Sequence, residues 1–251
     1  MKKKLETVDI LAVGAHPDDV ELGCGGTLAT MSSRGRTFGI LDLTRGESGT
    51  RGTPEIRAKE AAAAAAALGA RFRESLDLGD GGLRTDRAAE LEVIDVVRRC
   101  RPKLVIAPFP SDRHPDHVRA SRLTTEASFY AGLRSLARPG QAHRPQSVVY
   151  YASSYTQQPS FFVDVTACFE VKMKAIRCFA SQFYDPASDE PETVLTQRTF
   201  LDAVAARSQA YGRLINAGYA EAYVSPRPPT LWDPVEAFAG YEPGFEGSKR
   251  R

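Results

Sequence analysis

Short apolar runs alternate with longer segments of helical spacing along the first half of the chain. The apolar runs predict buried parallel strands, because a strand that is covered on both faces shows no polar–apolar alternation. The segments between them predict helices, since apolar or small residues recur there at intervals of three and four positions. The predicted strands are residues 8–13, 38–43, 72–78, 103–108, 147–152 and 161–165. The predicted helices are residues 23–35, 54–69, 88–100, 115–133, 169–183 and 193–217.

Cap and turn residues mark several of these boundaries. Thr53 followed by Pro54 is typical of a helix start, with threonine as the N-cap and proline at the first helical position. Gly35 marks the expected end of the preceding helix. Glycines spaced between Arg45 and Gly52 predict a mobile loop after the second strand.

The alternation of strands and helices determines the expected fold class. At least four strand–helix repeats predict an α/β fold with a doubly wound (Rossmann-like), mostly parallel sheet and helices on both faces. We expect one α/β domain over residues 1–225, and we predict no structure for the tail at residues 226–251. With the strand order 3-2-1-4-5, strands one and four are neighbours where the order reverses, and ligands bind beyond the carboxyl ends of such strands. We therefore expect an active site at the C-terminal ends of strands one and four.

Composition and charge exclude several classes of protein. Hydrophobic residues make up 42% and charged residues 25% of the 251 positions, which is typical of a globular protein. The formal net charge is +2, so no basic surplus indicates nucleic-acid binding. The longest apolar run, residues 61–70, is far shorter than the ~20 residues of a membrane span. The four cysteines form no Cys-x-x-Cys pair, which argues against a zinc ribbon or a disulfide framework.

The N-terminal segment and the net charge predict the cellular location of the protein and the classes of partner that it binds. The lysines at residues 2–4 are not followed by an apolar segment long enough for a signal peptide, so we expect a cytoplasmic protein. We interpret these lysines as a solvated N-terminus. We expect no nucleic-acid partner, no membrane partner and a homo-oligomeric assembly.

Two polar segments carry the candidate chemistry, and each follows a predicted strand. Residues 14–23 come after strand one, and residues 110–117 come after strand four. Three of the four histidines lie in these segments beside aspartates, namely His16, His114 and His117. Because strands one and four are expected to be neighbours, the two segments would face each other across one crevice.

The residue types in these segments are those that bind zinc. A catalytic zinc ion takes three protein ligands from His, Asp or Glu and keeps one position open for water. His16 and Asp19 are three residues apart, so one turn can direct both at an ion, and His117 would supply the third ligand. Asp18, His114 and Asp116 then remain for proton transfer and orientation. The alternative for a single His-x-x-Asp turn is a helix cap with a hydrogen-bonded histidine. Two such clusters at two strand ends favour the metal site.

The two segments resemble the signature of a known family. Residues 15–21 (Ala-His-Pro-Asp-Asp-Val-Glu), 23–27 and 114–117 are similar to the motifs of the PIG-L/LmbE family of zinc-dependent N-deacetylases. The resemblance extends over roughly residues 8–224. Within the family, the chain is most similar to the bacillithiol-pathway branch, on residues 43–47, 50–52, 108–117 and 181–183. Enzymes of that branch remove the acetyl group from N-acetyl-glucosaminyl-malate.

The resemblance implies a role for each residue of the two segments. It implies that Zn²⁺ is bound by His16, Asp19 and His117. It implies that Asp18 is the general base, that His114 is the electrophilic partner of the developing oxyanion, and that Asp116 orients His114. The implied partner is a small N-acetylated amino sugar.

Arginines and one tyrosine are the candidate substrate-binding residues. Arg57 matches a family arginine that contacts substrate, with a solvated charge on the helix surface as the alternative. A cation in the first turns of a helix faces an unfavourable dipole, so we expect a buried anionic or carbonyl partner for it. Arg113 lies beside the site, with a surface role as the alternative. Arg51, together with Arg45, lies near the loops expected over the crevice, where a guanidinium can bind a malate carboxylate through two hydrogen bonds. Tyr219 loosely matches a site tyrosine, with core packing as the alternative.

Other functions stay open. The enzyme could act on another N-acetylglucosamine derivative, such as a mycothiol precursor or a chitooligosaccharide. The chain could also be a non-catalytic sugar- or nucleotide-binding α/β protein. Gly23, Gly25 and Gly26 do not form a dinucleotide-binding motif, because that motif directly follows strand one; we interpret them as permitting close helix packing. Ser48 and Thr50 lack the strand–turn–helix setting of a nucleophilic serine.

Overall fold

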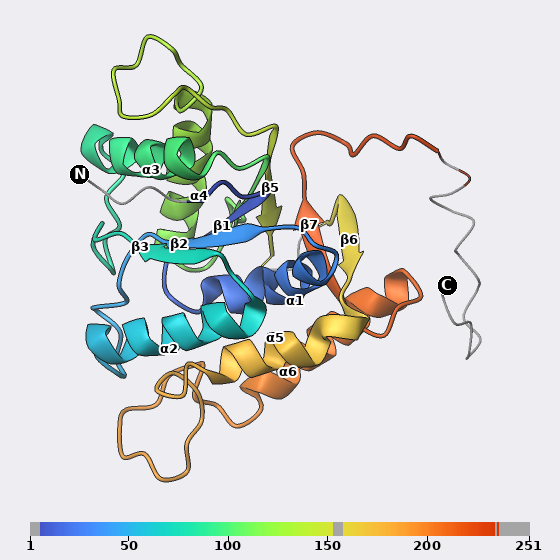
Figure 1. Ribbon diagram of the computed structural model, residues 1–251. Helices are drawn as coiled ribbons and strands as arrows, with labels where there is room; N and C mark the ends of the chain where they lie inside the picture. The colour runs from blue at the N-terminus through green and yellow to red at the C-terminus, as the bar shows by residue number, and fades with distance from the viewer. Residues whose placement is uncertain (1–5, 153–157, 234, 236–251) are drawn as a thin grey trace.

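A seven-stranded sheet lies between two layers of helices in the computed structural model (Figure 1). The structure describes residues 6–152, 158–233 and 235. The predicted solvated terminus at residues 2–4 lies outside the described residues, as does most of the predicted tail after residue 225.

The strands are ordered β3-β2-β1-β4-β5-β7-β6, which contains the predicted order 3-2-1-4-5. Their bounds are β1 Ile10–Gly14, β2 Phe38–Asp42, β3 Phe72–Ser75, β4 Leu104–Pro108, β5 Ser147–Tyr151, β6 Phe161–Asp164 and β7 Ala220–Val224. Strands β1 to β5 pair in parallel, whereas β7 is antiparallel to both β5 and β6. The predicted mostly parallel sheet is confirmed, with an antiparallel edge.

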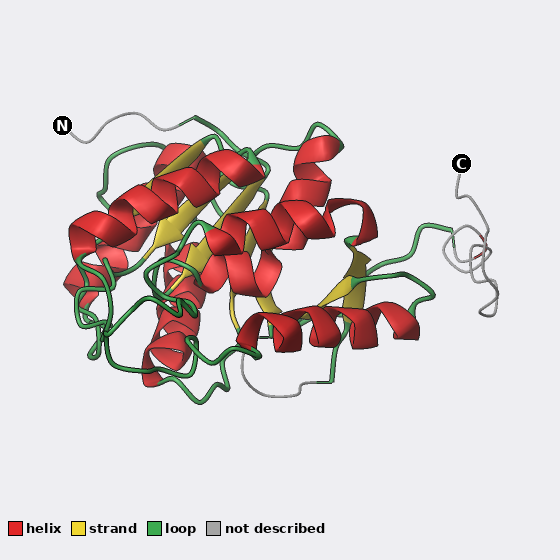
Figure 2. Ribbon diagram, turned by 90° about the horizontal axis from the view of Figure 1, so that it is seen from below, coloured by secondary structure: helices red, strands yellow, loops and turns green. Residues whose placement is uncertain are grey.

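The helices cover both faces of the sheet, as predicted (Figure 2). Their bounds are α1 Asp19–Ser33, α2 Pro54–Leu68, α3 Arg87–Cys100, α4 Pro115–Tyr130, α5 Phe169–Arg177 and α6 Phe200–Leu214. Alternate residues of β1 point to opposite faces: Ile10 and Ala12 pack with α1, α2 and α5, while Leu11 and Val13 pack with α3 and α4. Each face of the sheet therefore has its own hydrophobic core. None of the described helices combines the length and apolar character that crossing a membrane requires.

The predicted caps are present where the sequence indicated them. Thr53 is the N-cap of α2, and its hydroxyl accepts a hydrogen bond from the backbone N–H of Ile56. Gly69 and Gly35 have φ angles of +82° and +78°, which glycine adopts without the steric cost of a side chain.

Three helix boundaries differ from the prediction by four or more residues. Helix α1 begins at Asp19 rather than residue 23, which places Asp19 and Glu21 in its first turn, where acidic side chains interact favourably with the helix dipole. Helix α5 ends at Arg177 rather than residue 183. Helix α6 begins at Phe200 rather than residue 193, because Thr193 and Thr196 bond to each other in a turn.

Strand β7 was not predicted, because Glu221 interrupts its apolar pattern. The Glu221 carboxylate is buried and accepts hydrogen bonds from the backbone N–H groups of Gly26 (2.9 Å) and Thr27 (2.7 Å). It also forms an ion pair of 2.5 Å with Lys172 of α5. A charge that looks like a surface residue in the sequence is therefore a buried, fully paired group, which only the tertiary structure reveals.

The interpretation of the glycines in α1 is confirmed for Gly23 and Gly26. A Cβ atom on Gly23 would lie 2.2 Å from Cδ2 of the buried Tyr151 ring, and one on Gly26 would lie 2.9 Å from Cβ of Val165. At Gly25 the nearest such contact is 3.6 Å, so that position has room for a methyl group.

We expect Gly23→Ala to lower the free energy of unfolding by about 1–3 kcal/mol, because the added methyl group would overpack the contact with Tyr151. Gly25→Ala is the matched control: it should leave stability unchanged or raise it slightly, since alanine is favoured over glycine in a helix. Urea unfolding of the two variants measures the difference. Equal unfolding midpoints would contradict the predicted clash.

Candidate metal centre

The two polar segments meet at the C-terminal ends of two neighbouring central strands. Strands β1 and β4 pair in parallel, with Ile10 opposite Leu104, so their carboxyl ends lie side by side. The loop after β1 carries His16 and leads into α1, and the loop after β4 leads into α4 with His114 as its N-cap. A cavity of about 640 Å³ opens between them and is lined by residues of both segments.

The three predicted metal ligands converge in this cavity. His16 Nδ1 lies 3.6 Å from Asp19 Oδ2, and His117 Nε2 lies 3.1 Å from Asp19 Oδ1. Two atoms that each bind zinc at ~2.0–2.1 Å with tetrahedral geometry are ~3.3–3.4 Å apart. The side chains are about nine-tenths buried. The donor atoms are therefore of the types that bind zinc, and each histidine lies beside one oxygen of the Asp19 carboxylate.

The second nitrogen of each histidine ring also faces a carboxylate. His16 Nε2 lies 3.0 Å from Asp80 Oδ1, and His117 Nδ1 lies 3.2 Å from Asp112 Oδ1. Histidines that bind metals commonly place their other ring nitrogen against a carboxylate, which fixes the ring and its tautomer. Sequence reasoning gave neither Asp80 nor Asp112 a role. The available signal was the position of Asp80 in a glycine-rich turn after β3, at the same edge of the sheet.

Two further groupings of side chains share His16 with the predicted set. Ligand atoms of His16, Asp80 and Asp116 lie within 4.8 Å of one another, as do those of His16, His114 and His117. The cavity thus offers more than one donor set for a cation, and the predicted set is distinguished by Asp19, which contacts two of the histidines.

The carboxylates around the two rings favour the protonated histidines. Burial lowers the pKa of His16, but Asp116, Asp19 and Asp80 outweigh that effect and raise it to about 12. For His117, burial lowers the pKa, while Asp19 and Asp112 raise it to about 10. Burial raises the pKa of Asp19, but His117 and His16 bring it well below its usual range. A cation that binds here must displace protons, so its affinity decreases as the pH falls.

Asp18 combines backbone strain with burial. Its φ angle is +118°, a region that residues other than glycine rarely adopt and that costs ~1–3 kcal/mol. Its carboxylate lines the cavity, and Oδ2 lies 3.0 Å from Nη2 of Arg57. Burial raises the pKa of Asp18, the Arg57 charge lowers it, and the result is about 7. Asp18 can therefore exchange a proton near neutral pH.

His114 is oriented by the backbone rather than by a carboxylate. Its Nδ1 accepts a hydrogen bond from the backbone N–H of Asp116 (3.2 Å), so the neutral ring carries its proton on Nε2. Burial and the nearby His16 and His117 lower the pKa of His114. A neutral His114 ring beside His16 and His117 can donate a hydrogen bond into the cavity.

The hydrogen-bond partners of the Asp116 carboxylate are groups other than His114. It accepts hydrogen bonds from the backbone N–H groups of Gly81 (2.8 Å) and Leu83 (3.1 Å) and from Arg119 Nη1 (3.0 Å). The carboxylate therefore holds the loop after β3 against α4, and the contact with His114 belongs to the Asp116 backbone.

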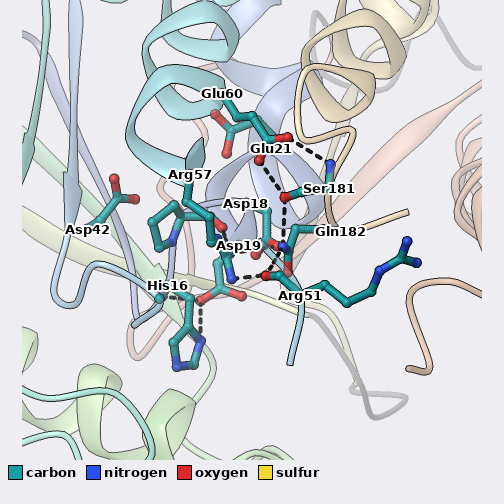
Figure 3. Close-up of polar contacts among 12 residues, drawn as sticks. His16, Asp18, Asp19, Glu21, Asp42, Arg51, Arg57, Glu60, Ser181 and Gln182 are labelled. Atoms are coloured by element: carbon teal, nitrogen blue, oxygen red, sulfur yellow. Dashed lines mark hydrogen bonds and ion pairs between the residues drawn. The ribbon is translucent and has the colours of Figure 1, made fainter. Parts of the chain in front are cut away.

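Arg57 has the buried carboxylate and carbonyl partners that we expect for a cation in the first turns of a helix. Its guanidinium is buried, and it donates to Asp18 Oδ2, to Gln182 Oε1 (3.1 Å) and to the backbone carbonyl of Pro17 (Figure 3). Arg57 lines the cavity, but its hydrogen bonds are directed at the protein.

Arg51 and Tyr219 are not among the residues that line the cavity. In Figure 3 the Arg51 guanidinium points away from His16. It donates hydrogen bonds to Glu190 Oε2 (3.0 Å), to Ser188 Oγ and to the backbone carbonyl of Phe183. The Tyr219 ring stacks on Phe169 with centroids 3.7 Å apart, which matches the core-packing alternative.

The outer wall of the cavity comes from the C-terminal part of the chain. Its apolar side chains are those of Val194, Leu195, Phe200, Ala203 and Val204. Two further cations, the exposed Arg113 and the half-buried Arg207 of α6, also line the cavity. Sequence reasoning did not identify this wall, because a helical period shows that α6 has a buried face but not what that face adjoins.

Comparisons with known proteins find both deacetylases and a hydratase among the similar sequences. The family model described as PIG-L: GlcNAc-PI de-N-acetylase matches residues 11–128. Diacetylchitobiose deacetylase of Thermococcus kodakarensis is 35% identical over 190 residues, which cover 69% of this chain and 70% of that protein. 4-Oxalmesaconate hydratase of Pseudomonas putida is 30% identical over 190 residues, covering 68% and 73%. Among solved structures, the conserved protein TT1542 from Thermus thermophilus superposes with a TM-score of 0.83 and 40% identity, covering 91% of this chain and 98% of that chain.

Proposed function

The chain belongs to the PIG-L family, and we propose that it is a zinc-dependent N-deacetylase of N-acetylglucosamine derivatives. The observation that carries this proposal is the convergence of His16 Nδ1, the Asp19 carboxylate and His117 Nε2 in one cavity. The strained, buried Asp18 lies directly beside them. Deacetylases among the relatives support the choice of reaction.

Each of these cavity residues has a separate role in the proposed amide hydrolysis. A zinc ion held by His16, Asp19 and His117 would lower the pKa of a water molecule from ~15.7 to ~7 and polarise the amide carbonyl. Asp18 accepts the proton of the attacking water, for which a pKa near neutral pH is suited. His114 donates a hydrogen bond from Nε2 to the oxyanion of the tetrahedral intermediate. The proton on Asp18 then becomes available to the leaving amine.

We further propose N-acetyl-glucosaminyl-malate, the bacillithiol precursor, as the substrate. Of the four arginines considered from the sequence, Arg51 is bound to Glu190, and Arg45 forms an ion pair of 3.3 Å with Asp77. Arg57 is occupied by Asp18. Arg113 and Arg207 line the cavity, where a guanidinium can bind a malate carboxylate through two hydrogen bonds.

Acetate release from a panel of substrates tests the proposed function. The panel contains N-acetyl-glucosaminyl-malate, diacetylchitobiose and the N-acetylglucosaminyl-inositol precursor of mycothiol, at one pH and zinc concentration. Release from the malate compound supports the specific proposal, and preferred release from a neutral substrate replaces it with one of the alternatives. Binding without acetate release from any of them would support a non-catalytic sugar-binding protein. Hydration of an unsaturated dicarboxylate would favour the activity of the hydratase relative.

We expect kcat/KM for N-acetyl-glucosaminyl-malate to exceed that for free N-acetylglucosamine by at least ~10-fold. A charge-assisted hydrogen bond contributes ~1.5–3 kcal/mol, and ~1.4 kcal/mol corresponds to a factor of ten. One arginine–carboxylate contact kept in the transition state is therefore enough. Steady-state kinetics on both substrates measure the ratio.

Arg207→Met should reduce this ratio by lowering kcat/KM for the malate substrate alone. Arg45→Met is the matched control, since Arg45 does not line the cavity and pairs with Asp77. Equal kcat/KM for the two substrates in the wild-type protein would remove the malate assignment and leave the deacetylase chemistry in place.

A further inference from the structure

Gln182 forms hydrogen bonds with Arg57, the partner of the candidate base Asp18, and with the loop that carries Arg51. Its side chain is buried, and it follows α5 in the segment at residues 181–183. Its Oε1 accepts a hydrogen bond from Arg57 Nη1 (3.1 Å), and its Nε2 donates to the backbone carbonyl of Arg51 (2.8 Å) and to Ser181 Oγ (2.9 Å) (Figure 3). Because both ends of the amide are hydrogen-bonded, its orientation is fixed.

Arg57 in turn is held on one side by Gln182 and on the other by Asp18. Its Nη2 donates to Asp18 Oδ2 (3.0 Å) and to the carbonyl of Pro17, while its buried Nε has no hydrogen-bond partner among the described residues. A Cβ atom on Gly46 would lie 2.8 Å from the guanidinium carbon, so the glycine-rich loop packs closely against Arg57. The contact with Gln182 is thus what fixes Nη1.

The segment that carries Gln182 is itself anchored to α2. The backbone N–H and the hydroxyl of Ser181 both bind the Glu60 carboxylate, at 2.7 and 2.8 Å. Glu60 lies three residues after Arg57 on α2, one helical turn further along. The Arg57 side chain and the residue that orients it therefore share one rigid support.

We propose that Gln182 is a positioning residue for deacetylation: its amide holds the Arg57 guanidinium, which directs the Asp18 carboxylate into the cavity. The inference rests on the proposed function, in which Asp18 is the base. Gln182 lines the cavity but acts through Arg57 and need not touch the substrate. A displacement of a reacting group by about 1 Å can cost ~100-fold in rate, so a fixed Arg57 matters for the chemical step more than for binding.

Gln182→Met tests this directly, because methionine has a similar length and lacks both amide hydrogen bonds. We expect kcat to fall ~10–100-fold while KM changes less than ~3-fold and the bound metal per chain stays at the wild-type value. Glu190→Gln is the matched control: it weakens the ion pair with Arg51 in the adjoining loop without touching Gln182 or Arg57. An equal loss of kcat in Glu190→Gln, or unchanged kcat in Gln182→Met, would overturn the proposal.

A double-mutant cycle with Arg57→Met separates positioning from a general structural role. If Gln182 acts through Arg57, then Gln182→Met changes kcat less than ~2-fold in the Arg57→Met background. The full loss in both backgrounds would show that Gln182 acts independently of Arg57 and would overturn the proposal.

A crystal structure of Gln182→Met gives a readout that does not depend on activity. We expect the Arg57 guanidinium to move away from Asp18, and an unchanged Arg57–Asp18 pair would contradict the inference. If the wild-type protein releases no acetate, the proposed function fails, while the movement of Arg57 still decides whether Gln182 positions it.

Discussion

Asp18→Asn is expected to lower kcat by ~10²–10⁴-fold while the protein keeps its metal. Loss of a general base typically has an effect of this size. Asparagine preserves the volume of the side chain, tolerates the positive φ angle of +118°, and can still accept the hydrogen bond from Arg57. The substitution therefore removes the proton-accepting group and little else.

Turnover of the deacetylase substrate and zinc content per chain, measured on the same preparations, decide this prediction. Asp95→Asn is the matched control, because Asp95 is also buried and paired with an arginine, Arg138, but does not line the cavity. It should keep wild-type kcat. Turnover near the wild-type value in Asp18→Asn would place the base elsewhere, and loss of zinc would show that Asp18 rather than Asp19 binds the ion.

The fold was predictable where local signals and general packing rules agree. Apolar runs identified β1 to β5 with small boundary errors, and caps such as Thr53 and Pro54 marked the start of α2. The order 3-2-1-4-5 is one of the common orders of doubly wound sheets, and the observed sheet contains it. Strand β7 was missed because Glu221 is stabilised by Lys172 and by the backbone of α1, partners that are 49 or more residues away.

The site was predictable in its residue types and only partly in its contacts. Histidines and aspartates after β1 and β4 meet because parallel strands end at one edge of a sheet. Sequence spacing does not determine where a long side chain points, so Arg51 was assigned to the cavity although it binds Glu190. Arg207 was missed for the corresponding reason, since its place in the cavity depends on how α6 packs.

His117→Ala is expected to lower zinc affinity by at least ~100-fold and to abolish deacetylation. Loss of a residue that merely supports a metal ligand costs ~10–100-fold, so loss of one of three ligands should cost more. Zinc per chain after dialysis, together with competition against a chelator, measures the change. His143→Ala is the matched control: this fourth histidine contacts the carbonyl of Pro102 and does not line the cavity, so its removal should leave zinc binding intact.

The comparison of His117→Ala with Asp80→Asn distinguishes the predicted donor set from the set of His16, Asp80 and Asp116. If zinc is bound by His16, Asp19 and His117, then His117→Ala loses the metal, whereas Asp80→Asn weakens binding only ~10–100-fold, because Asp80 faces the second nitrogen of His16. If His16, Asp80 and Asp116 form the site, the order reverses. Full zinc occupancy in His117→Ala together with its loss in Asp80→Asn would therefore move the metal toward the loop after β3. The assignment of Asp18 as the base rests on a metal held by His16, Asp19 and His117, so that result would remove its support.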